Sequence, residues 1–194
     1  MKIEQFVMAY KVEQDRIRAI LPDGFESLRP VMRINTEIKD EKRAYIEFNT
    51  PVEYAGKRGW LNIGHWEGDD DKVSYSKENK TTVIETPFFK LTYTGTGTEG
   101  GCPAEKDNDG CFFIDEKINF KPSEKIGSNK EFCDCEFEWK FNDGDACGVS
   151  NRESIPAFFE EPKITYEKWE FSAENATAIE CEKILGSYVV VFER

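Results

Sequence analysis

The sequence predicts a β-rich fold with mainly antiparallel strands and a few short helices. Several runs alternate between apolar and polar residues at period two, the pattern of strands with one buried face. The segments between these runs contain glycine, proline, asparagine and aspartate, which favour turns. Only two short segments, 12–21 and 154–160, have helical features. Strands joined by tight turns therefore dominate the prediction.

The composition bounds the size and the surface of the protein. The 194 residues suit a single domain, 1–194, and a hydrophobic content of 39% supplies one large core. A formal net charge of −12 repels nucleic-acid phosphates and anionic lipids, so neither is an expected partner. Any site for an organic acid must then be a local basic pocket. A homo-oligomer is compatible with this composition.

The sequence also indicates where the protein acts. Residues 1–12 lack the apolar run and the small-residue cleavage site of a secretory signal. No run approaches the roughly 18 apolar residues that span a bilayer. We therefore expect a cytoplasmic protein.

The first elements are predicted as a strand, a helix and a second strand. Residues 6–11 have strand character, and 12–21 form an amphipathic helix that Pro22 and Gly24 end. Residues 31–38 alternate. One face carries Met32, Ile34, Thr36 and Ile38, and the other carries Val31, Arg33, Asn35 and Glu37. The polar face is either solvated or the wall of a polar cavity, and wet faces are the commoner case in antiparallel sheets.

A β-hairpin is predicted at the centre of the chain. Its strands are 45–49 and 60–66, and the turn is 55–59, whose glycines tolerate positive φ. Alternation places His65, the only histidine, on the apolar face with Leu61 and Ile63. A histidine there is more often a core residue than a catalyst, although it titrates near neutral pH.

The rest of the chain is predicted as strands separated by polar loops. Strands are expected at 81–93, with an interruption at Pro87, and at 131–141, 164–171 and 187–193. Loops or turns are expected at 67–80, 95–102, 115–129 and 142–145. Within the first loop, Asp69–Asp71 lacks the glycine and glutamate positions of a calcium-binding EF-hand, so a solvated loop tip is expected.

The six cysteines favour free thiols over a metal site. Cys133 and Cys135 share a strand face, but the paired spacing typical of structural zinc is absent. Unpaired cysteines are among the most buried residues, so we expect packed core thiols, with no metal and no cofactor.

Four segments together resemble the acetoacetate decarboxylase-like superfamily. They are Ala9-Tyr10-Lys11, the run from Asp15 to Phe25 (DRIRAILPDGF), Pro30-Val31-Met32-Arg33-Ile34, and the run from Thr50 to Gly59 (TPVEYAGKRG). The resemblance covers about the first third of the chain. It implies an antiparallel β-barrel that encloses a central cavity for a small keto acid.

The resemblance also implies a chemistry. In the family, a lysine forms a Schiff base with the ketone, and a neighbouring cation lowers its pKa. This lysine pair follows a proline, and here Pro87 is followed by Phe88 and Phe89. Lys90 lies one residue further, and a shift of one residue turns a strand side chain to the opposite face. The family's cavity glutamates fall near Asn35 and near Tyr45 or Glu47.

Three functional hypotheses follow. In the first, the protein binds a small organic acid through Arg33, Asn35, Glu47 and His65, and the decarboxylase chemistry is lost or altered. In the second, it is an active Schiff-base decarboxylase, a lyase, with Lys90 as the nucleophile. In the third, it is a non-catalytic β-barrel that binds a protein partner. The sequence leaves open whether the chain is an enzyme.

Overall fold

The computed structural model describes residues 1–68, 72–102, 109–123, 129–140 and 166–194, and the backbone of 146–147. The helices are α1 (Gln14–Ile20) and α2 (Ala173–Thr177). The strands are β1 (Lys2–Lys11), β2 (Glu26–Ser27), β3 (Val31–Lys39), β4 (Arg43–Tyr54), β5 (Lys57–Glu67), β6 (Ser74–Glu78), β7 (Thr81–Glu85), β8 (Phe89–Glu99), β9 (Gly110–Ile114), β10 (Ile118–Pro122), β11 (Lys130–Trp139), β12 (Ala146–Cys147) and β13 (Lys183–Glu193). Neither helix is long and apolar enough to cross a membrane.

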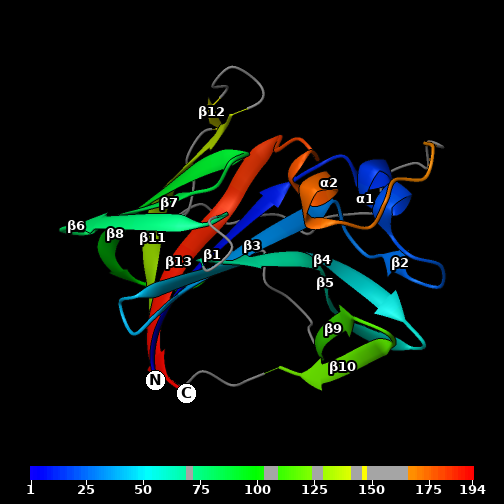
Figure 1. Cartoon of the computed structure of the whole chain (residues 1–194), viewed down its shortest axis with the longest axis horizontal. Coiled ribbons are helices and arrows are strands. Elements are labelled where there is room, and N and C mark those ends of the chain that lie inside the picture. Colours follow the sequence, from blue (N-terminus) through cyan, green and yellow to red (C-terminus); the bar gives the residue numbers. More distant parts are fainter. Residues whose placement is uncertain (69–71, 103–108, 124–128, 141–145, 148–165) are drawn as a thin grey trace.

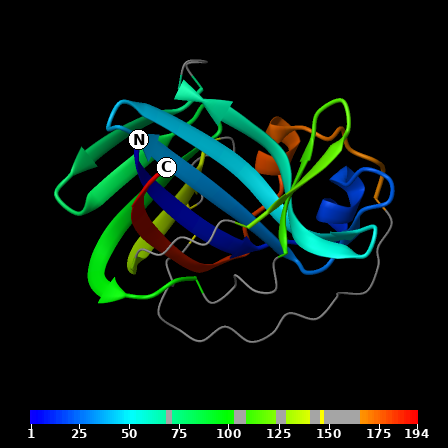
Figure 2. The same ribbon diagram turned by 90° about the horizontal axis from the view of Figure 1, so that it is seen from below.

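All the described strands belong to one sheet. Its order is β10-β9-β5-β4-β3-β1-β13-β11-β8-β7-β6, with β2 beside β4 and β12 beside β11. The pairs are antiparallel except β5 with β9, so the predicted β-rich, mainly antiparallel class is confirmed. The sheet is curved but not closed, because no pairing joins β10 to β6 within the described residues. The two helices lie close together near one end of it (Figures 1 and 2).

The central strands are buried on both faces. The main core lies on one face and includes Phe48, Phe89 and Phe137. A second core lies on the other face, around Trp60 and Tyr188. Every residue from Val31 to Ile38 is buried as a result. The two faces of this strand are those predicted, but the solvated interpretation of its polar face is wrong.

Helix α1 forms where the sequence predicts it. Ile17 and Ile20 recur at helical spacing, and both are buried in the main core. The helix ends at Ile20 because the ring of Pro22 disfavours helical geometry at Leu21, which is extended with φ −64° and ψ 136°. The chain then turns back towards β2 and β3.

The central hairpin has a shorter turn than predicted. Only Ala55 (φ 50°) and Gly56 (φ 76°) lie between the paired residues Tyr54 and Lys57. Two consecutive residues with positive φ match the twist of the flanking strands. Residues 57–59, predicted as turn, therefore belong to β5.

Three predicted loops contain strands. Strand β6 lies within 67–80, β8 continues through 95–99, and β10 lies within 115–129. Pro87 separates β7 from β8, so the strand predicted over 81–93 is two strands. The described part of 164–171 is not a strand, whereas α2, which follows it, was not predicted. Asp69–Asp71, the turn at 142–145 and the helix at 154–160 lie outside the described residues.

The alternation of β11 is confirmed. Cys133, Cys135, Phe137 and Trp139 are buried in the main core, and Asp134 and Glu136 on the opposite face are exposed. Five of the cysteines, Cys102, Cys111, Cys133, Cys135 and Cys181, are free thiols, and four of these are buried.

Candidate functional site

Polar side chains from β3, β4 and β5 meet on the face of the sheet opposite the main core. Asn35 pairs directly across from Glu47, and Glu47 pairs directly across from His65. Directly opposed residues project from the same face of a sheet. Three of the predicted site residues are therefore neighbours.

The Glu47 carboxylate accepts four hydrogen bonds from neutral side chains. Its Oε1 accepts from Nδ2 of Asn35 (2.8 Å) and Nδ2 of Asn49 (3.2 Å). Its Oε2 accepts from the hydroxyl of Tyr45 (2.8 Å) and Nδ2 of Asn62 (3.1 Å). We call these five residues the Glu47 cluster. Since an ionised carboxylate has about four acceptor sites, Glu47 is saturated and serves to orient its four donors.

Tyr45 is held as a hydrogen-bond donor. Burial, followed by the negative charge of Glu47, raises the pKa of the Tyr45 phenol far above its ordinary value. Both causes disfavour a phenolate. The hydroxyl therefore stays protonated at neutral pH.

One acceptor of the cluster is available. The Asn35 side chain donates through Nδ2 to Glu47, and its buried Oδ1 has no hydrogen-bond partner among the described residues. Asn35 is 7% exposed. A buried amide oxygen without a partner costs about 1–3 kcal/mol. Such an oxygen favours a bound molecule that can donate a hydrogen bond to it.

Arg33 supplies a cation at one end of the cluster. It precedes Asn35 by two residues on the same face of β3, and it pairs directly across from Asn49. Its guanidinium carbon lies 4.0 Å from the centre of the Trp60 ring, and the residue is 5% exposed. Stacking on the indole fixes the plane of the guanidinium, which suits it to bind a carboxylate.

The charges around the cluster are nearly balanced. Glu37 follows Asn35 on the same face of β3 and forms ion pairs with Lys39 (3.8 Å) and Arg194 (3.6 Å). Glu37 also accepts a weak hydrogen bond from Gln5 (3.4 Å). Arg33 and Lys39 therefore offset Glu37 and Glu47, although the whole chain carries a formal charge of −12. An anion meets less repulsion here than elsewhere on the protein.

A β-bulge places His65 on the side of the cluster. Asn49 pairs with Asn62 and Phe48 with Gly64, so Ile63 is an extra residue in β5. The extra residue reverses the alternation beyond it. His65 is exposed, and its ring lies 5.5 Å from that of Tyr45. The prediction that His65 shares the apolar face with Leu61 and Ile63 is wrong for this reason.

Lys90 is not brought to the cluster. Four strands, β3, β1, β13 and β11, lie between β4 and β8 in the sheet. The Nζ of Lys90 lies 3.5 Å from a carboxylate oxygen of Glu138, and the side chains are 39% and 41% exposed. This is a surface ion pair in which both side chains are in contact with solvent.

The two residues after Pro87 are packed aromatic side chains. Phe89 is fully buried, with its ring 5.9 Å from that of Phe48 and 5.3 Å from that of Phe137. Phe88 is half-buried and stacks on Trp66 at 5.4 Å. The positions that match the family's lysine pair therefore contribute to the main core.

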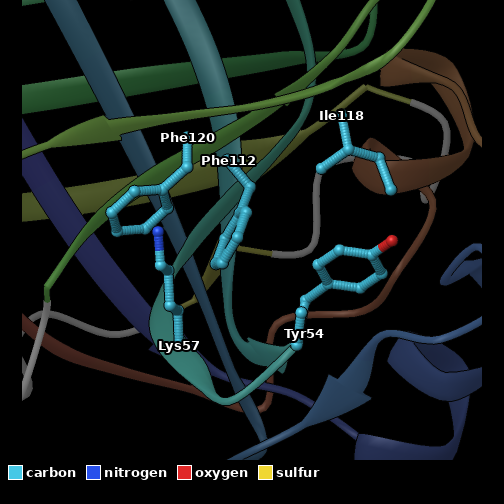
Figure 3. A pocket seen from close by; sticks show the side chains of 6 residues that line it. Tyr54, Lys57, Phe112, Ile118 and Phe120 are labelled. Carbon is cyan, nitrogen blue, oxygen red and sulfur yellow. The ribbon is translucent and has the colours of Figure 1, made fainter.

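A pocket lies elsewhere, beside the turn of the central hairpin (Figure 3). Its volume is about 400 Å³. It is lined by Tyr54, Ala55, Lys57, Phe112, Ile118 and Phe120. None of these residues belongs to the Glu47 cluster, so this pocket and the convergent polar groups lie in different parts of the structure. The polar groups are the better guide to the candidate site, because the three asparagines are buried and all four donors are oriented by Glu47.

The two thiols of β11, Cys133 and Cys135, are poor metal ligands. Burial and the negative charges of Glu131 and Asp134 raise the pKa of Cys133 to about 12, and burial likewise raises that of Cys135. A thiol must lose its proton to bind a metal. The described residues contain no group of three or more histidine, cysteine, aspartate or glutamate side chains that could hold a metal ion.

Tyr45, Asn49 and Asn62 were not among the candidate site residues selected from the sequence. Tyr45 and Asn49 lie two residues either side of Glu47 on the same face of β4, so alternation alone could have found them. Alternation along the sequence does not connect Asn62 with Glu47. It joins the cluster through the pairing of β4 with β5, which the bulge at Ile63 shifts by one residue.

Comparison with solved structures identifies the fold. The enduracididine biosynthesis enzyme MppR in complex with pyruvate matches with a TM-score of 0.54 and 10% identity, over 98% of this chain and 84% of that chain. The acetoacetate decarboxylase of Legionella pneumophila matches with a TM-score of 0.55 and 14% identity, over 98% and 81%. No protein-family model and no curated protein sequence matches this chain.

These matches correct the extent of the resemblance. The four sequence segments lie in about the first third of the chain, whereas the structural similarity extends over 98% of it. At 10–14% identity, the later strands match in their places in the fold, although most residues differ. The chain therefore has the acetoacetate decarboxylase-like fold.

Proposed function

We propose that the protein binds a small organic acid at the Glu47 cluster and does not decarboxylate it through a Schiff base. Arg33 binds the carboxylate of the ligand, and Asn35 and its neighbours orient the polar groups beside it. The observation that carries the proposal is the row of Asn35, Glu47 and Asn62, in which a partly buried carboxylate holds two buried amides, with a buried arginine at its end.

The arrangement favours binding because its groups are held before a ligand arrives. The amide groups of Asn35, Asn49 and Asn62 are each fixed by Glu47. Arg33 is fixed by its stacking on Trp60. Rigid groups lose little conformational freedom when a ligand binds, which improves affinity.

The surroundings of Lys90 argue against Schiff-base chemistry at this residue. A lysine attacks a ketone as the free amine, which enzymes obtain by desolvation or by a neighbouring cation. Lys90 has the opposite surroundings, namely solvent and the Glu138 carboxylate. Phe88 and Phe89 occupy the positions that match the family's lysines.

Binding of pyruvate and acetoacetate by isothermal titration calorimetry tests the proposal. Pyruvate is a rational probe because MppR, which shares the fold, was solved in complex with it. We expect measurable binding to the wild type, and a dissociation constant about tenfold higher in Arg33→Met, since a hydrogen-bonded charge contributes about 1.5–3 kcal/mol. Arg33→Lys keeps the charge and retains part of the affinity.

Arg43→Met is the matched control. Arg43 is half exposed and forms a long ion pair with Glu67 (3.9 Å). Because it is not part of the proposed site, we expect its removal to leave the affinity unchanged. Circular dichroism verifies that each variant folds. Absence of binding, or equal affinity in folded Arg33→Met and wild type, contradicts the proposal and leaves the protein-interaction hypothesis as the stronger one.

Reductive trapping tests the loss of Schiff-base chemistry. We expect that incubation with acetoacetate and borohydride adds no mass to peptides containing Lys90, and that no carbon dioxide is released. A mass increase on Lys90 that disappears in Lys90→Ala contradicts this and restores the decarboxylase hypothesis.

A further inference from the structure

The pocket beside the central hairpin joins two parts of the chain. Tyr54 ends β4, Lys57 begins β5 and Ala55 lies in the turn between them, while Phe112 comes from β9. Ile118 and Phe120 come from β10. Lys57 lies beside Phe120 at one end, Tyr54 and Ile118 lie at the other, and Phe112 lies between them (Figure 3). The pocket thus has a charged end and an apolar end.

The aromatic side chains that line the pocket are held in place by contacts with neighbouring rings. Phe112 is 2% exposed, and its ring lies 4.7 Å from that of Phe120 and 6.1 Å from that of Tyr54. Phe25 stacks on Tyr54 at 4.4 Å from the core side. Walls held in this way present ring faces and edges to a flat apolar ligand at little cost in side-chain entropy.

Two glycines hold the halves of the pocket together. Strand β9 pairs with β5 so closely that a Cβ on Gly59 would lie 2.5 Å from the carbonyl oxygen of Gly110. A Cβ on Gly110 would lie 2.2 Å from the carbonyl oxygen of Lys121. No side chain fits at either position, so the sequence fixes the approach of β9 and β10 to the hairpin.

Lys57 is the only cation among the lining residues, and no carboxylate neutralises it among the described residues. Its Nζ lies 4.7 Å from the centre of the Phe120 ring. The adjacent Arg58 differs, because its Nε is 3.0 Å from a carboxylate oxygen of Glu53. In a chain with a formal charge of −12, an unneutralised cation at the end of an aromatic pocket is complementary to an anion with an apolar body.

We propose that this pocket binds a small aromatic carboxylate. The ring lies against Phe112, Tyr54 and Ile118, and the carboxylate pairs with the ammonium of Lys57. The volume of about 400 Å³ is within the range of small-molecule sites. The pocket is separate from the Glu47 cluster, with which it shares no residue. Tyr54 and Glu47 are seven residues apart on β4, which corresponds to a length of about 23 Å in an extended strand.

Titration with 2-naphthoate and with its neutral analogue 2-naphthamide tests the proposal. Naphthoate is a flat ring with a carboxylate, and the amide keeps the ring and loses the charge. We expect naphthoate to bind about fivefold more tightly than the amide, the ratio that an exposed ion pair of about 1 kcal/mol gives. Lys57→Met removes that difference, and Lys57→Arg retains it.

Arg58→Met is the matched control, because it removes a neighbouring cation that is already paired with Glu53. Its naphthoate affinity equals that of the wild type. The proposal is overturned by absence of naphthoate binding, by equal binding of acid and amide, or by an unchanged preference in Lys57→Met. A loss of naphthoate binding in Arg33→Met with none in Lys57→Met assigns the ligand to the Glu47 cluster and also overturns it.

Discussion

Glu47 and Glu138 are both carboxylates that contact a side chain of a neighbouring strand, but their surroundings differ. Glu47 accepts four hydrogen bonds from neutral donors at the centre of the sheet. Glu138 contacts one lysine, Lys90, and is 41% exposed. The first arrangement orients several groups at once, whereas the second is a solvated ion pair.

The difference arises from burial, because the asparagines that bind Glu47 are buried, whereas Lys90 and Glu138 are 39% and 41% exposed. Both faces of β3 are covered, so polar groups on it must find partners within the protein. The Glu138 carboxylate is accessible to water. A selective binding site needs polar groups that are buried and hydrogen-bonded within the protein. Such groups discriminate strongly between the molecules that contact them. Three predictions sharpen this comparison.

The largest effect is expected from Phe89→Lys, which places a lysine at one of the two positions after Pro87. Phe89 is fully buried between Phe48 and Phe137. Loss of its packing and burial of an ammonium lower the free energy of unfolding by about 4 kcal/mol or more. Urea unfolding followed by circular dichroism measures this.

Phe88→Lys is the companion variant. Phe88 is half-buried against Trp66, so we expect a loss of about 1–2 kcal/mol. If Phe89→Lys were as stable as the wild type, the position would be able to hold a lysine, and the comparison between buried and solvated sites would fail.

An intermediate effect is expected from Glu47→Leu. The substitution leaves four donors without their acceptor and lowers the free energy of unfolding by about 3 kcal/mol. Glu138→Leu is the matched control, with a change below about 0.5 kcal/mol because its partner is solvated. Equal losses in the two variants, measured by urea unfolding, would show that the Glu47 cluster is not held as described.

The smallest effect is expected from Lys90→Met. An ion pair with side chains 39% and 41% exposed contributes about 0.5 kcal/mol or less. The affinity for pyruvate stays that of the wild type because Lys90 is remote from the Glu47 cluster. A large loss of affinity in this variant, with normal folding, would return Lys90 to the site.

Much of the fold could be predicted from side-chain alternation. The faces of β3 and β11, the helix α1 and the central hairpin all follow from apolar residues at the expected periods. The strands missed within predicted loops have weaker patterns. Strand β6 reads Ser-Tyr-Ser-Lys-Glu and lies at the edge of the sheet, where burial imposes little alternation.

The site could be predicted only in part. Arg33, Asn35, Glu47 and His65 were predicted from their places on strands, and the family resemblance also indicated the positions of Asn35 and Glu47. Their convergence depends on the register between strands, which the composition of each strand does not reveal. The bulge at Ile63 is such a case, since one extra residue brings His65 and Asn62 to the same face.

The position of β1 has a consequence for how the protein is made. This strand lies between β3 and β13, and Lys2 pairs with Glu193. During synthesis, one edge of β1 therefore stays open until β13 leaves the ribosome. Contacts between residues so far apart in sequence slow folding, and an open strand edge attracts other chains. A chaperone that shields this edge would raise the yield of folded protein without any change in its final stability.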